Sequence, residues 1–133
     1  MGNIGNTYDT QKFSVGHARK VWRETRKQYP GGGTVENVAD WAEKGVIPSG
    51  RPCKFDSKEK TVKVYTTEQV TASTAADLGI NGYIQEDVRI LDGKTIGSAT
   101  VIYDGEIYEY MFSEAEATIL KANTATPMIV WVQ

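Results

Sequence analysis

A run of one proline and three glycines, Pro30-Gly31-Gly32-Gly33, divides this 133-residue chain after its first thirty residues. Proline has no backbone N–H and glycine disfavours regular structure, so neither a helix nor a central strand is expected to continue through the run. The charge changes at the same place. Residues 1–30 carry six Lys or Arg against two acidic residues, a balance of +4, and residues 31–133 carry nine against fifteen, a balance of −6. The sequence therefore predicts a basic N-terminal arm, residues 1–30, hinged on an acidic domain, residues 31–133.

The composition is typical of one globular domain without a cofactor. With 40% hydrophobic and 24% charged residues, the chain has no apolar run near the roughly 20 residues of a membrane-spanning helix. Its first residues also lack the apolar stretch of a secretory signal. One cysteine and one histidine are too few for a structural zinc site within one chain. We expect Cys53 to be a small buried residue and His17 an ordinary surface or interface residue, with no metal, no cofactor and no membrane partner.

No catalytic motif appears in the sequence. It has no phosphate-binding glycine loop, no Gly-x-Ser-x-Gly nucleophile turn and no His-Glu-x-x-His zinc motif. The adjacent acids Glu86 and Asp87 would point to opposite faces of a strand, so they would not converge on a substrate. The sequence therefore indicates a protein that is not an enzyme.

The second half of the arm fits two structures. Ala18, Val21, Trp22 and Thr25 would share one face of a short helix over residues 17–28. Gly16 and the β-branched residues weaken a helix, and an arm that becomes ordered only on a partner is the alternative.

Beyond the glycines, the pattern predicts a β-rich α+β domain with two short helices. Those helices are expected over residues 35–44 and, from a Ser-x-x-Glu capping box at Ser113, to residue 121. Strands are expected in a hairpin over residues 53–64 with a charged tip, over residues 83–91, in a second hairpin over residues 98–112 and over residues 127–132. Asp104-Gly105 would be the type I′ turn of that second hairpin. Residues 66–77 are expected to be mostly loop, with room for a strand over residues 69–72.

Three segments resemble a known family. They are residues 47–65, which pass from a Pro-Ser-Gly turn through Asp56-Ser57 to alternating valines; residues 80–88, with Gly-Tyr-Ile; and residues 99–112, with Thr-Val-Ile-Tyr-Asp-Gly. A short apolar strand follows at the end of the chain. This order is similar to that of lambda-type head decoration proteins of tailed phages, and the resemblance covers residues 47–132.

The resemblance implies a compact β-barrel-like or β-sandwich domain. It also implies a virion protein that sits as a homotrimer on the outer surface of the capsid, stabilises the head and binds the major capsid protein through its N-terminal arm. Other decoration or fibre proteins are further expected partners. The arm of this chain departs from the family, because it is basic and aromatic where the family has Ser, Thr, Ala and Pro.

The expected capsid-binding residues are the aromatic, apolar and basic side chains of the arm. A strand added to the capsid protein would supply backbone hydrogen bonds, and Trp and Arg are common anchors of interfaces. We therefore expect deletion of residues 1–30 to leave a folded domain that no longer binds capsids. The candidate residues are Phe13, Val15, Arg19, Lys20, Val21, Trp22, Arg23, Arg26, Lys27 and Tyr29.

Two other functions are compatible with the sequence. A nucleic-acid-binding module could use the same basic residues for phosphates and the aromatic residues for bases, although the acidic domain disfavours a nucleic acid partner. Another virion component, such as a head fibre base or a connector subunit, is the second alternative.

Overall fold

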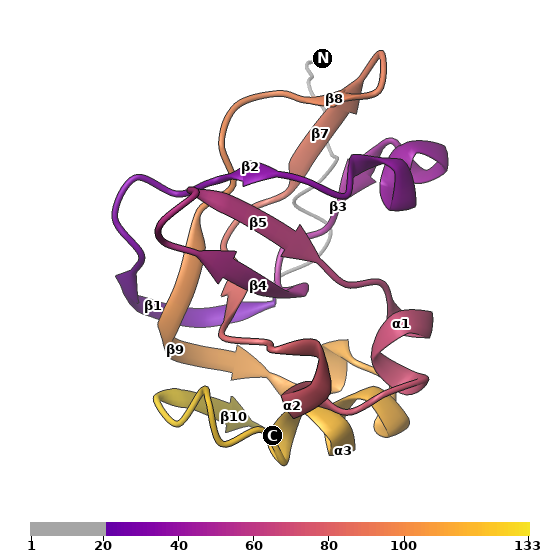
Figure 1. Ribbon diagram of the computed structural model, residues 1–133. Coiled ribbons are helices and arrows are strands. Elements are labelled where there is room, and N and C mark those ends of the chain that lie inside the picture. The colour runs from indigo at the N-terminus through magenta and orange to yellow at the C-terminus, as the bar shows by residue number, and fades with distance from the viewer. Residues whose placement is uncertain (1–20) are drawn as a thin grey trace, which may run out of the picture.

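A computed structural model describes residues 21–133, and its main feature is a seven-stranded sheet (Figure 1). The order along the sheet is β1-β9-β6-β4-β5-β2, and β10 pairs with β9 in parallel beside this path. A separate sheet has the order β3-β7-β8. The strands are β1 (Trp22–Gln28), β2 (Thr34–Val35), β3 (Val46–Ile47), β4 (Pro52–Asp56), β5 (Thr61–Val64), β6 (Gly82–Ile84), β7 (Val88–Leu91), β8 (Lys94–Thr95), β9 (Val101–Tyr108) and β10 (Ile129–Val132).

The helices are short and few, which confirms a β-rich α+β protein. They are α1 (Thr67–Thr71), α2 (Ala75–Leu78) and α3 (Glu114–Lys121), together with 3-10 helices over Val38–Lys44 and Glu109–Met111. The strand pairings within residues 21–133 do not close the sheet into a barrel.

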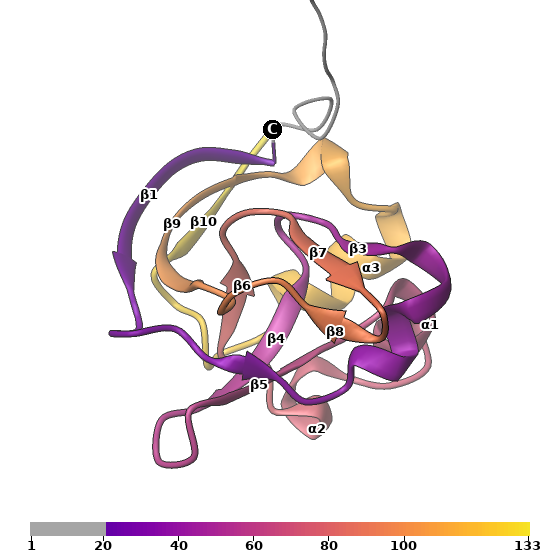
Figure 2. The same cartoon turned by 90° about the horizontal axis from the view of Figure 1, so that it is seen from above.

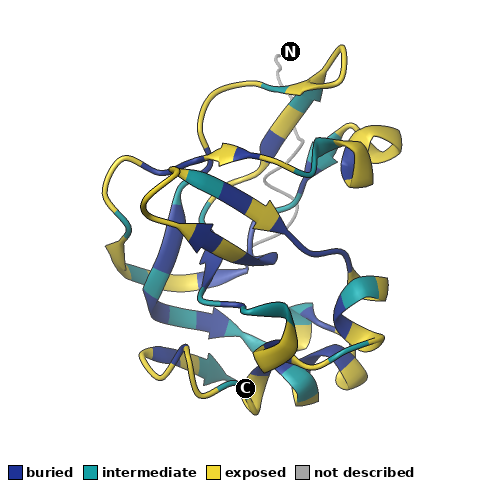
Figure 3. Cartoon of the chain, in the orientation of Figure 1, coloured by how far each residue is buried: buried dark blue, intermediate teal, exposed yellow. Residues whose placement is uncertain are grey.

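The core has two parts, one on each side of the junction between β6 and β9. Figure 3 shows buried residues along β4, β5 and β9, whereas the tip of the β7–β8 hairpin is exposed. The first part lies against the helices and includes Trp22, Tyr83, Ile102, Ile107 and Leu120. The second part lies between β4, β5 and the 3-10 helix and includes Trp41, Ile47, Phe55, Val62 and Val101.

Residues 22–28 form a strand of the domain itself, so the expected short helix over residues 17–28 is wrong for this part. β1 pairs antiparallel with β9, from Trp22 opposite Ile107 to Gln28 opposite Ile102. Figure 2 shows β1 following the outer side of β9 along a curved path. The partner that orders these residues is therefore a strand of the same chain about eighty residues later. No local sequence pattern predicts this pairing.

The hairpin expected at Asp104-Gly105 is also wrong, because β9 runs through both residues without turning. Gly105 is needed for a close approach. A Cβ atom there would lie 2.7 Å from the backbone oxygen of Glu24 and 3.1 Å from the Trp22 ring. The two-residue turn lies at Asp92-Gly93, where φ is +53° and +76° and β7 pairs with β8.

The glycine run is a fixed turn, contrary to the expected hinge. Gly33 N donates a hydrogen bond to Ala99 O at 2.9 Å, and Ala99 N donates one to Gly33 O at 2.8 Å. Gly32 has φ of +59°, and a Cβ atom on it would lie 2.5 Å from Ala99 O. The run therefore connects β1 to β2 against the segment that precedes β9.

Most of the remaining local predictions are confirmed. The hairpin around the charged tip is β4–β5, the final strand is β10, and α3 begins at Ser113, whose hydroxyl accepts a hydrogen bond from Glu116 N. Three predictions need correction. The strand expected over residues 83–91 is two strands, β6 and β7, which belong to different sheets. Within the helix expected over residues 35–44, residues 34–35 are β2 and a 3-10 helix starts at residue 38. The segment 66–77 forms α1 and α2, because the hydroxyls of Thr66 and Thr74 cap their first turns.

The position of β1 changes the expected effect of truncation. Deletion of residues 1–20 should leave unfolding cooperative, because every described strand and helix is kept. Deletion of residues 1–30 should abolish cooperative unfolding, because it removes β1 and the buried Trp22. Loss of a buried Trp side chain alone costs about 3–5 kcal/mol of a total stability of about 5–15 kcal/mol. Thermal unfolding of both variants followed by circular dichroism tests this, and equal unfolding temperatures would contradict the role of β1.

Candidate functional site

Val21, the first described residue, is held firmly in the domain. Val21 is 1% exposed, and its carbonyl oxygen accepts a hydrogen bond from Tyr108 N at 2.8 Å. Its side chain packs on Gly50, where a Cβ atom would lie 2.3 Å from Val21 Cγ1. The N-terminal segment is therefore attached at a fixed position beside the end of β9, which we call the exit (Val21, Trp22 and Tyr108).

The side chain of Trp22 also holds the start of β1 in the domain. Its side chain is buried, and Nε1 donates a hydrogen bond to Ile84 O at 3.0 Å. The ring meets Tyr83 edge to face with centroids 6.4 Å apart. Because Val21 and Trp22 pack in the core of their own chain, neither side chain is available to a capsid partner in this conformation.

The side chain of Tyr29 also makes its contacts within the domain. Its ring stacks on Phe55 and lies beside Tyr103, with both centroid distances 4.7 Å. Its hydroxyl donates a hydrogen bond to Asn81 O at 3.1 Å. Partial burial raises the pKa of Tyr29. This residue therefore joins the end of β1 to β4 and β9.

The two arginines of β1 bind carboxylates on and beside β9. Arg26 donates from Nε to Asp104 at 3.0 Å and from Nη1 to Glu106 at 3.1 Å and Glu24 at 2.7 Å. Arg23 Nη1 lies 2.7 Å from Glu106. Hydrogen bonds to Glu24, Glu106 and Asp104 raise the pKa of Arg26, so it stays charged. Part of the positive charge of the arm is therefore neutralised by the domain.

The ten residues expected to bind the capsid thus fall into three groups. Phe13, Val15, Arg19 and Lys20, like His17, lie outside the described residues. Val21, Trp22 and Tyr29 pack inside the domain, and Arg23 and Arg26 form ion pairs with it. Lys27 is exposed and forms no ion pair with any residue of the described part. The sequence pattern gave no signal for Asp104 and Glu106 as ion-pair partners of β1, because they were assigned to a hairpin of their own.

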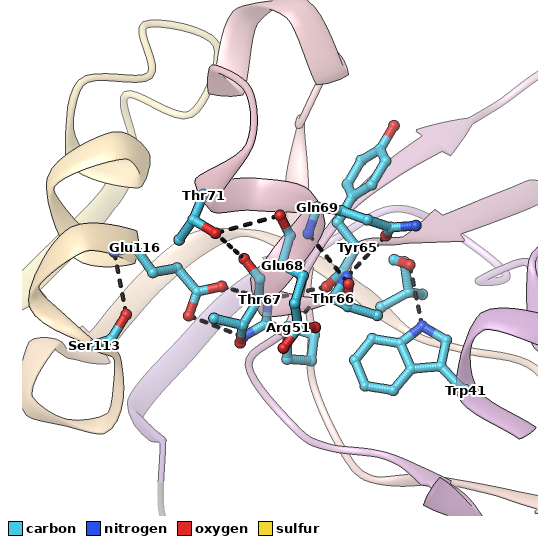
Figure 4. Close-up of polar contacts among 11 residues, drawn as sticks. Trp41, Arg51, Tyr65, Thr66, Thr67, Glu68, Gln69, Thr71, Ser113 and Glu116 are labelled. Atoms are coloured by element: carbon cyan, nitrogen blue, oxygen red, sulfur yellow. Dashed lines mark hydrogen bonds and ion pairs between the residues drawn. The ribbon is translucent and has the colours of Figure 1, made fainter. Parts of the chain in front are cut away.

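A second charged pair is buried between β4 and α3 (Figure 4). Arg51 donates to both carboxylate oxygens of Glu116 and, from Nε and Nη2, to Tyr65 O at 3.1 and 3.0 Å. Arg51 is 5% exposed and Glu116 2%. Arg51 and Glu116 bond to each other, and Arg51 also bonds to the backbone. The pair therefore joins α3 to the sheet and is not open to a ligand.

Metal-binding residues do not cluster within residues 21–133. No cluster of three or more His, Cys, Asp or Glu there could hold a metal ion. Cys53 is fully buried, as expected from the sequence, and burial raises the pKa of its thiol. A cleft of about 360 Å³ beside the β4–β5 hairpin is lined by both lysines and carboxylates, including Lys54, Lys63 and Asp77. No helix in the described part is long and apolar enough to cross a membrane.

Comparisons of the chain with protein-family models, with curated proteins and with solved structures found no match.

Replacing both arginines, Arg23→Glu with Arg26→Glu, should destabilise the fold. The two new carboxylates would face Glu24, Asp104 and Glu106 across the β1–β9 pairing, where like charges repel. We expect a lower urea midpoint and partial recovery in high salt. Lys94→Glu, a charge reversal at an exposed residue of β8 that forms no ion pair with any residue of the described part, should leave the midpoint unchanged. Equal midpoints for the double variant and the wild type would show that these ion pairs contribute nothing.

Proposed function

We propose that this protein is a decoration protein that binds the outer surface of a phage head and stabilises the shell. Residues 1–20 dock on the major capsid protein, and three copies associate as a homotrimer. The observation that carries this proposal is the exit: a rigid, sheet-rich domain fixes the base of a basic, aromatic-containing segment at Val21 and Trp22. Such an arrangement suits attachment, because no slack separates the segment from the domain.

The resemblance to decoration proteins supports the same function, because its three segments form one continuous part of the fold. Residues 47–65 contribute β4 and β5, residues 80–88 contribute β6, and residues 99–112 contribute β9. These strands are neighbours in the order β9-β6-β4-β5. The motifs are therefore the central strands of one sheet.

The contact with the capsid is assigned to the first twenty residues. They carry Lys12, Arg19 and Lys20 against Asp9, and the alternating apolar pair Phe13 and Val15. An extended segment of this kind can add a strand to an exposed sheet edge, with apolar pockets for alternate side chains. In a trimer, three linked segments would gain avidity of the order of 10²–10⁴ over one when the sites can be spanned.

The nucleic-acid alternative receives less support. Arg23 and Arg26 already bind three carboxylates, so phosphates would have to displace these partners. Another virion component, such as a head fibre base or connector subunit, would use the same exit and remains the second candidate.

Binding to shells tests the proposal. Empty shells assembled from the major capsid protein of the same genome should retain the full chain on sedimentation and release the variant lacking residues 1–20. Lys94→Glu, a charge reversal at an exposed residue of β8 outside the segment, should bind like the wild type. Full binding by the truncated variant would refute docking through residues 1–20. Tight binding to duplex DNA that weakens steeply with salt would favour the nucleic-acid alternative instead.

A further inference from the structure

The outer edges of the large sheet differ in how well they are protected against strand addition. β1 carries four charged residues and three register irregularities, and β2 has only two residues. Such features discourage pairing with another strand. β10, Ile-Val-Trp-Val, is uncharged and rich in β-branched residues. It is therefore the edge of this sheet that is best suited to accept a strand.

The register of β10 defines which backbone groups are open. Gly105 N donates to Met128 O, and the parallel ladder with β9 continues through alternate residues of β10. The N–H and C=O of Trp131 therefore face away from β9, and no backbone group in the described part pairs with them. Val130 is 49% exposed and Met128 43%. Ile129 N donates to Thr126 O at 3.3 Å, so the open part of this apolar outer edge within the described residues is at Trp131.

An acidic and aromatic groove continues from the end of this edge. It has a volume of about 250 Å³ and is lined by Glu109, Tyr110, Phe112, Glu114, Ala117 and Gln133. Tyr110 is 67% exposed. Glu109 already binds Lys121 and Gln133, whereas Glu114 has no ion pair with any residue of the described part. The edge and the groove together fit an extended peptide that is both apolar and basic.

The exit of the N-terminal segment lies next to this surface. Val21 O is bonded to Tyr108 N on one side of β9, and Val132 pairs with Tyr108 on the other. Glu109 follows Tyr108 directly, and Lys20 and Arg19 are one and two residues from Val21 along the sequence.

We propose that the β10 edge and the groove bind residues 12–20 of the same chain. Arg19 and Lys20 would contact the acidic groove, and Phe13-Ser14-Val15 would pair with Trp131. Reaching the outer edge of β10 from β1 means crossing three strand spacings, about 14 Å. Residues 16–20 span up to about 17 Å when extended, so the connection is long enough.

Docking within one chain needs little intrinsic affinity, because the attachment at Val21 keeps the segment at a high effective concentration. Its consequence for assembly rests on the proposed function: a capsid protein would have to displace residues 12–20 from the domain before binding them. Residues 12–20 would then be bound to their own domain in the free protein and to the capsid protein on the shell.

Amide hydrogen exchange of Trp131 in the full chain tests the docking. In the wild type this amide should exchange at least about 10-fold more slowly than in the double variant Phe13→Asp with Val15→Asp. Ile4→Asp, an equivalent change outside residues 12–20, should exchange like the wild type. Equal exchange in wild type and double variant would overturn the proposal. Protection that increases with protein concentration would also overturn it, because the segment would then come from a second copy.

Charge reversal tests the groove in the same measurement. Glu114→Lys should speed exchange of Trp131, and combining it with Arg19→Glu should restore the slow exchange. Glu59→Lys, at the distant tip of the β4–β5 hairpin, is the control and should have no effect. Failure of Glu114→Lys to change the exchange would remove the acidic groove from the site. Because no capsid is present, such a failure leaves the proposed function untouched.

Discussion

The pairing of β1 with β9 is the contact on which the rest of the structure depends. It brings residues 22–28 beside residues 101–108, and it places Trp22 over the core next to Tyr83. It also requires Gly105, because any side chain there would collide with the backbone of Glu24. The point where the N-terminal segment leaves the domain is a direct consequence of this pairing.

The same pairing changes the meaning of the charge division in the sequence. Residues 1–30 and the rest of the chain differ strongly in charge, but two arginines of the basic part bind three carboxylates across β1 and β9. The ion pairs of these arginines therefore lie within the fold, and one of them joins Arg26 to the nearly buried Asp104. Of the other basic residues of the arm, Lys12, Arg19 and Lys20 lie in residues 1–20, and Lys27 is exposed and outside these ion pairs.

Local patterns predicted the elements whose determinants lie close together in sequence. Alternating residues on both sides of a charged tip predicted β4–β5, and the cap at Ser113 predicted α3. The β1–β9 pairing could not be found in this way, because its two strands are far apart in sequence and Gly105 imitates a turn residue. Asp92-Gly93 and Asp104-Gly105 are the same dipeptide, and only the first turns, because β9 is fixed on both sides by β1 and β10.

The central claim is that residues 22–28 are a strand of the folded domain, paired with β9. Hydrogen exchange of the β1 amides in the full chain tests this most directly. Amides of β1 that are bonded to β9 should exchange as slowly as those of β9 itself, because they would open only with the whole domain. Exchange of these β1 amides at the rate of an unstructured peptide, while β9 stays protected, would contradict the account.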